Sequence, residues 1–184
     1  SLIETIKEVV KRVAETSKRL NDRVREELRK VEREVEELNR EVERVLREVE
    51  TAVDDLVKKI EDEEKVRRVE ELVREVAREV RELIKENKEE VDRIAKEVEE
   101  LVETDKRDVD RVVREVEELL KRVRRREEAE DIIRKIEEVL KKSKELNDRI
   151  IERIKKMLED LRRHNEEIIE KIRRALKRLE DEAR

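Results

Sequence analysis

Apolar residues recur every three or four positions along almost the whole chain, and this pattern constrains the fold more than any other feature. Steps of three and four place residues on one side of an α-helix, so the pattern predicts amphipathic helices that are much longer than usual. The apolar positions that follow Leu20 are Val24, Leu28, Val31, Val35, Leu38, Val42, Val45, Val49, Val53, Leu56 and Ile60.

The apolar stripe also repeats at an interval of 18 residues, as in Leu20 and Leu38 or Ile150 and Ile168. Eighteen residues are five turns of an α-helix at 3.6 residues per turn. A seven-residue repeat would impose a left-handed supercoil, whereas this interval keeps the stripe straight along the helix. The sequence therefore predicts nearly untwisted helices.

The composition leaves little material for β-structure. The chain has 184 residues without Gly, Pro, Cys or an aromatic residue, and 58% of it is Asp, Glu, Lys or Arg. Tight turns and most strand formers are therefore missing. Such a high charge content is also typical of disorder, but 51 basic and 56 acidic residues nearly balance and the apolar residues are periodic. An all-α fold follows.

The stripe is interrupted twice, between Ile60 and Val66 and between Val123 and Ala129. Each six-residue step would rotate the stripe by about 120° on a continuous helix, so the chain is expected to reverse at both places. The result is an up-down-up antiparallel three-helix bundle.

The expected bundle is one domain over residues 1–184, with helices at about 2–61, 64–124 and 128–183. Asp62 is expected to cap the start of the second helix. Helices commonly end at a Gly, and here no Gly is available, so the sequence leaves the conformation of both loops open.

Polar residues on or beside the stripe share the same 18-residue spacing. The pairs are Asn21 and Asn39, Asn87 and Asp105, and Asn147 and Asn165. In two antiparallel helices, the numbers of two residues that lie at the same height, one on each helix, add up to the same value all along the pair. The members of the first and second helices sum to 126, and those of the second and third sum to 252. These sums place the reversals near residues 63 and 126, inside the two interruptions of the stripe.

Two polar layers are therefore expected in the core. One contains Asn21, Asp105 and Asn147, joined by Ser17, Thr104 and Ser143, and the other contains Asn39, Asn87 and Asn165, with His164. Hydrogen bonds between helices at these levels would specify the register, because a slipped register leaves polar groups in apolar layers. On this view, replacing Asn87 by Leu would barely change or would raise stability. The alternative places these Asn residues at the solvent edge of the stripe, with local or water contacts.

The Glu/Arg/Lys surface, the Val/Ile/Leu core, the 18-residue repeat and the matched Asn layers together resemble the family of de novo designed, parametrically generated helical bundles with buried hydrogen-bond networks. The resemblance covers the whole chain and implies a structural scaffold. The chain departs from the family by having no Gly or Pro in its connections.

No residue pattern points to chemistry. His164 is the only His and there is no Cys, so zinc would lack ligands, and the Glu-x-x-His motif of di-metal bundles is absent because Leu161 stands three positions before His164. We expect no catalytic residue, cofactor, metal, nucleic-acid, membrane or small-molecule partner. A monomer is the leading expectation, and a homo-oligomer or domain-swapped helical rod is the alternative. The sequence gives no localisation beyond that of a soluble protein.

Overall fold

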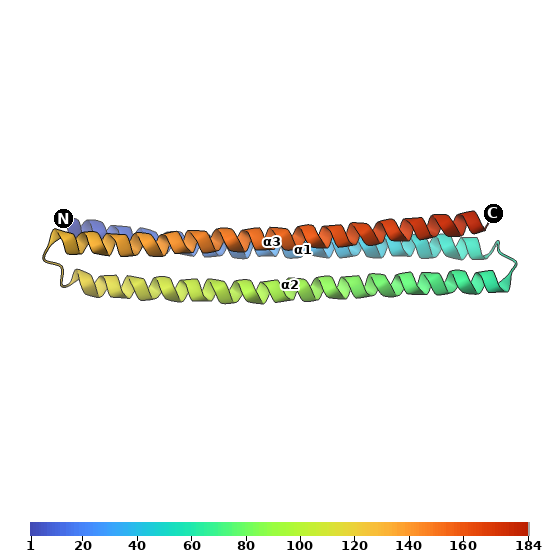
Figure 1. Cartoon of the computed structure of the whole chain (residues 1–184), viewed down its shortest axis with the longest axis horizontal. Helices are drawn as coiled ribbons and strands as arrows, with labels where there is room; N and C mark the ends of the chain where they lie inside the picture. Colours follow the sequence, from blue (N-terminus) through green and yellow to red (C-terminus); the bar gives the residue numbers. More distant parts are fainter. Residues whose placement is uncertain (184) are drawn as a thin grey trace. The chain divides into compact units, whose positions relative to one another are not determined.

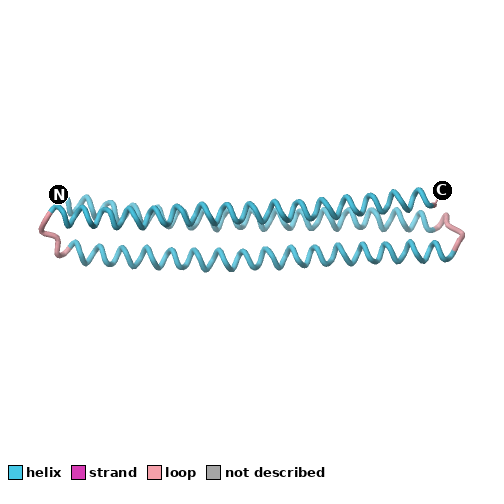
Figure 2. Tube along the Cα trace, in the orientation of Figure 1, coloured by secondary structure: helices cyan, strands magenta, loops and turns pink. Residues whose placement is uncertain are grey.

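The computed structural model describes residues 1–183, which form three α-helices joined by two short loops (Figures 1 and 2). The helices are α1 (Leu2–Val57), α2 (Glu63–Leu120) and α3 (Arg126–Glu182), and no strand occurs within residues 1–183. The prediction of an all-α three-helix bundle is confirmed. The predicted domain also included residue 184, which lies outside the described residues.

Side chains satisfy backbone N–H groups at or near the start of each helix. Ser1 Oγ accepts a hydrogen bond from the Glu4 N–H at 3.3 Å, and Asp62 Oδ1 accepts one from the Glu64 N–H at 3.0 Å. The predicted cap at Asp62 is thus confirmed. Just before α3, the Arg124 N–H donates to Glu128 Oε2 at 3.2 Å. The first N–H groups of a helix have no carbonyl of a preceding turn to bind, and these side chains supply acceptors instead.

α1 and α2 end without Gly because each closes with a tighter turn. The Lys59 N–H donates to the Leu56 carbonyl at 3.0 Å, and the Arg122 N–H donates to the Leu119 carbonyl at 3.0 Å. Such three-residue steps satisfy the last carbonyls without a left-handed residue, and no residue of the described chain has a positive φ. α1 ends at Val57 and α2 at Leu120, earlier than the predicted 61 and 124.

Contacts divide the chain into two compact units, where the sequence predicted one domain. Unit 1 consists of Ser1–Lys30 and Arg93–Lys155, and unit 2 consists of Val31–Asp92 and Lys156–Arg184. Each helix contributes residues to both units. Within each unit, three helical segments pack together and the α2 segment runs antiparallel to the other two (Figure 1).

The core of unit 1 is made almost entirely of aliphatic side chains from all three helices. The N-terminus lies at the same end of this unit as the loop between α2 and α3 (Figure 1). One buried cluster of this core consists of Ile6, Val10, Val13, Val109, Val116, Leu120, Ala129, Ile132, Ile136 and Val139.

The core of unit 2 has the same character, and its α1–α2 loop lies at the same end of the unit as the end of α3 (Figure 1). Val42 is fully buried here and Val80 is 1% exposed. Val42 and Val80 belong to a buried cluster that also contains Val45, Leu46, Val49, Val53, Val69, Ala77, Leu83, Ile84, Ile169, Ile172 and Leu179. In both units the apolar stripe read from the sequence forms the core.

Candidate functional site: the buried polar layers

Asn87 on α2 joins the three helices of unit 2 through hydrogen bonds in the core. Its Nδ2 group donates to Asn39 Oδ1 on α1 at 2.9 Å and to Asn165 Oδ1 on α3 at 2.8 Å. Asn39, Asn87 and Asn165 are 5%, 1% and 1% exposed, so all three are core residues and not boundary residues. One side chain of the middle helix therefore contacts a partner on each of the other two.

The donors and acceptors of this layer do not balance. A side-chain amide carries two N–H groups and one carbonyl, and Asn87 uses both N–H groups as donors. Asn165 must present its carbonyl to Asn87, and its Nδ2 is then buried without a hydrogen-bond partner. Turning the Asn165 amide over would place two Nδ2 groups face to face, so the orientation of Asn165 is fixed by Asn87.

Asp105 on α2 has the same central position in unit 1, but it accepts hydrogen bonds. Ser17 Oγ on α1 donates to Asp105 Oδ2 at 3.1 Å, and Ser143 Oγ on α3 donates to Asp105 Oδ1 at 2.7 Å. The three side chains are 7%, 2% and 3% exposed for Asp105, Ser17 and Ser143. Each carboxylate oxygen has a hydroxyl donor from a different helix, which compensates part of the cost of burying the group.

The partners of Asp105 lie one helical turn from the Asn residues that were expected at its level. Side chains in a helix lean toward the N-terminus of that helix. In two antiparallel helices, two side chains that meet therefore belong to residues with slightly higher numbers than the two residues whose Cα atoms lie at the height of the contact. The loops, at residues 58–62 and 121–125, are centred a few residues before the predicted reversals at 63 and 126.

Four of the predicted layer residues have other environments. Asn21 is only partly buried and lines a groove between α1 and α2 with Ser17, which agrees with the boundary alternative. Thr104 and His164 are exposed, and His164 lines a groove together with Asn87, so their participation in the layers stays a prediction. Asn147 is buried at 3% exposure, but its Oδ1 has no hydrogen-bond partner.

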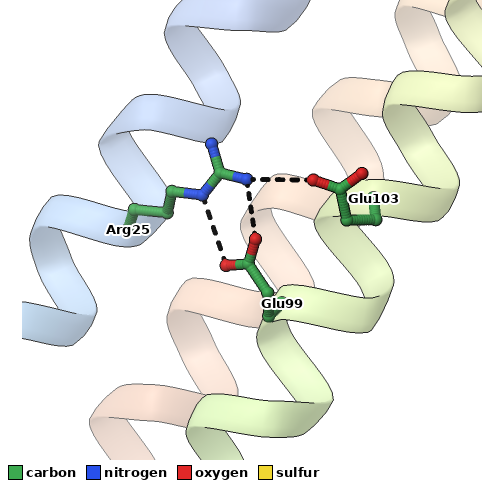
Figure 3. Close-up of polar contacts among 3 residues, drawn as sticks. All are labelled: Arg25, Glu99 and Glu103. Carbon is green, nitrogen blue, oxygen red and sulfur yellow. Dashed lines mark hydrogen bonds and ion pairs between the residues drawn. The ribbon is translucent and has the colours of Figure 1, made fainter.

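Ion pairs between helices lie at the edge of the core, and the sequence analysis did not identify them. Figure 3 shows the Arg25 guanidinium of α1 between two carboxylates of α2. Arg25 Nη2 donates to Glu99 Oε1 at 2.9 Å and to Glu103 Oε1 at 3.5 Å, and Arg25 Nε donates to Glu99 Oε2 at 3.3 Å. The hydrogen bonds to Glu99 raise the pKa of Arg25, against the opposing effect of partial burial.

Similar pairs connect the other helices, and their positions follow from the register. Lys135 Nζ on α3 lies 2.9 Å from Glu115 Oε2 on α2, and the hydrogen bond from Lys135 lowers the pKa of Glu115. In unit 2, Lys171 Nζ lies 2.9 Å from Glu79 Oε2. The residue numbers sum to 124 and 128 for Arg25 with Glu99 and Glu103 and to 250 for both lysine pairs, so each pair lies within two of the sums 126 and 252 of the polar layers.

The described residues offer polar and charged side chains but no assembled metal centre. Within residues 1–183, no group of three or more His, Cys, Asp or Glu could hold a metal ion. Over the same residues, none of the helices combines the length and apolar character that a membrane span needs. No protein-family model matches the sequence, and no curated protein is similar to it.

Proposed function

We infer that this chain is a designed structural scaffold without a biochemical reaction of its own, in which the two polar layers specify the helix register. The observation that carries the proposal is the pair of central α2 residues. Asn87 donates to α1 and α3 in unit 2, and Asp105 accepts from α1 and α3 in unit 1. A polar residue that contacts both neighbouring helices suits the selection of one packing arrangement.

The reasoning rests on the cost of mismatched polar groups. If one helix moved by a turn, the buried groups of Asn87 would face aliphatic side chains such as Val35 or Leu161, and each unpartnered group would cost about 1–3 kcal/mol. The aliphatic residues tolerate such a move much better, because Val, Ile and Leu recur at every turn and fill similar space. The polar layers therefore separate the intended register from its neighbours, as a buried Asn does in coiled coils.

The composition supports a designed origin. A chain of average usage would contain about 7% Gly and about 5% Pro, and this one contains neither. Its repeat interval is the number of residues in five whole helical turns, and the polar positions follow the same interval. These are features of a sequence written for a helical backbone.

The proposal is tested with a double variant, Asn87→Val and Asp105→Val, which makes the centre of both layers aliphatic. We expect the variant to stay helical by circular dichroism but to lose its single register. Its amide NMR spectrum would then contain more than one set of peaks, or its mass by light scattering would exceed the 22.5 kDa of one chain. The control is Val98→Ile, a buried aliphatic exchange on the same helix.

The proposal fails if the double variant gives one set of peaks and the mass of one chain. The mass of the unmodified protein separates the scaffold from the alternative of a self-assembly module. A value near 22.5 kDa is expected for the scaffold, and a multiple of it would favour assembly.

A further inference from the structure

An apolar groove with a volume of about 640 Å³ lies between the start of α1 and the end of α2 in unit 1. Its apolar walls are Ile3, Val10 and Ala14 of α1 and Val113 and Leu120 of α2. Ala14 and Val113 are small side chains, so the two helix surfaces leave space between them. The volume falls in the range of about 300–1,000 Å³ that is usual for small-molecule sites.

The rim of this groove carries an excess of positive charge. Lys7 and Lys11 of α1 and Lys121 of α2 line it, and Glu117 is the acidic member. Lys121 is paired with Glu118 at 3.2 Å, whereas Lys7 and Lys11 have no ion pair with any other residue of the described chain.

The groove also has apolar surface in contact with solvent. Ile3 is 37% exposed, although the other aliphatic residues of the groove are at least half buried. Ile3, Lys7, Val10 and Ala14 follow one another along one side of α1 at steps of three and four. They span about 16 Å at about 1.5 Å per residue, which suits a linear chain better than a compact ring system.

We propose that this groove binds a single-chain amphiphile with an anionic headgroup, such as an alkyl carboxylate. The headgroup lies beside Lys7 and Lys11, whose side chains lean toward the start of α1, and the alkyl chain runs from there against Val10, Ala14 and Val113. The inference goes beyond the scaffold role and beyond the sequence analysis, which expected no small-molecule ligand because the groove is formed by residues about 100 positions apart.

Charge distinguishes this occupant from a second copy of the chain. A symmetric dimer would place the same patch of both copies face to face. Each copy would then present three lysines and one carboxylate, that of Glu117, to the same set of charges, so the two positively charged patches would repel each other. An anionic headgroup instead meets two lysines that lack partners.

The binding test is isothermal titration calorimetry of the full chain with sodium dodecanoate below its micellar concentration. We expect saturable binding to one site. A fully buried methylene corresponds to a roughly fourfold change in the dissociation constant, so decanoate should bind about four- to fifteenfold more weakly than dodecanoate. Dodecyltrimethylammonium has the same chain and the opposite charge, and should bind at least about tenfold more weakly.

Variants of opposite expected sign locate the site. The double variant Lys7→Gln and Lys11→Gln should weaken dodecanoate binding by roughly three- to tenfold, and Glu117→Gln should strengthen it by roughly two- to threefold. Ala14→Leu should fill the groove and abolish binding. Lys144→Gln, an exposed lysine of α3 in the same unit, is the matched control and should change nothing.

Circular dichroism of each variant shows whether the helices are retained. The proposal is overturned if dodecanoate gives no saturable binding, if the cationic amphiphile binds equally well, or if the Lys7 and Lys11 variant and Ala14→Leu bind as tightly as the unmodified chain. Self-association that buries the groove would appear as absent binding together with a mass above 22.5 kDa, and it would also overturn the proposal.

Discussion

Replacing Asn87 by Leu should destabilise the protein, although the sequence alone predicts little change or a gain. The structure changes the expectation because Asn87 donates to two buried carbonyl oxygens, those of Asn39 and Asn165. Without this donor, both oxygens lose a buried partner, at a cost of about 1–3 kcal/mol each. Burying a leucine contributes about 1.5–3 kcal/mol, but fitting it into a space shaped for Asn costs about 1–3 kcal/mol. The net loss is about 2–4 kcal/mol.

The same substitution at Asn147 should have the opposite effect. Asn147 is 3% exposed, close to the 1% of Asn87, but its Oδ1 has no hydrogen-bond partner. Leucine removes this unpartnered atom, which recovers about 1–3 kcal/mol, and its burial offsets the strain of fitting it. We expect Asn147→Leu to raise the free energy of unfolding by about 1–3 kcal/mol.

The two variants form a matched pair, measured by guanidinium denaturation followed by far-UV circular dichroism. A third variant with Leu at 39, 87 and 165 tests whether the loss comes from stranded carbonyl groups, because it removes those groups as well. It should be at least as stable as the unmodified chain. If Asn87→Leu were as stable as Asn147→Leu, the hydrogen bonds of Asn87 would contribute nothing net and the reasoning would be refuted.

Three further predictions concern polar contacts in unit 1. Asp105→Asn should change the free energy of unfolding by less than about 1 kcal/mol in denaturation, because the amide can accept from Ser143 and donate to the Ser17 hydroxyl; a larger loss would show that the charge itself is required. Arg25→Ala should lower the free energy of unfolding by about 0.2–1 kcal/mol in low salt and by almost nothing in about 1 M NaCl, since its partners Glu99 and Glu103 are half exposed. A loss of stability that is independent of salt would contradict this prediction. Lys135→Gln should raise the lowered pKa of Glu115 toward its ordinary value in an NMR titration of the side-chain carboxyl carbon. The stability from this pair is present above the pKa of unfolded glutamate and is lost as the pH falls through the folded value, and an unchanged pKa would show that Lys135 does not cause the shift.

The sequence predicts the helices well because their signal is repeated many times. Each turn from Val24 to Val53 supplies an independent apolar position, and the six-residue steps at Ile60 and Val123 mark the reversals. The ends of the helices are less predictable, since a turn such as that from Leu56 to Lys59 uses only backbone groups. The straightness of the helices, predicted from the 18-residue interval, stays a prediction.

The sequence predicts which polar residues lie at about the same height along neighbouring helices, but it does not predict which of them form hydrogen bonds. Residue sums identify Asn39, Asn87 and Asn165 as neighbours, and the structure joins them through Asn87. The sums depend on Cα positions, whereas hydrogen bonds depend on the length and lean of each side chain. A shift of one turn is therefore enough to give Asp105 serine partners and to leave Asn21 partly exposed.

The two layers differ in whether three helices can satisfy one polar group. A carboxylate only accepts and a serine hydroxyl donates one hydrogen, so the hydrogen bonds of Asp105 with Ser17 and Ser143 involve no side-chain amide N–H group. An amide that uses both N–H groups forces its two partners to present carbonyls, and their own N–H groups then need acceptors elsewhere. Asn165 Nδ2 has none within the described chain. Three asparagines around a three-helix core thus leave one buried donor without an acceptor, while one aspartate with two serines has a hydroxyl donor for each of its two oxygens.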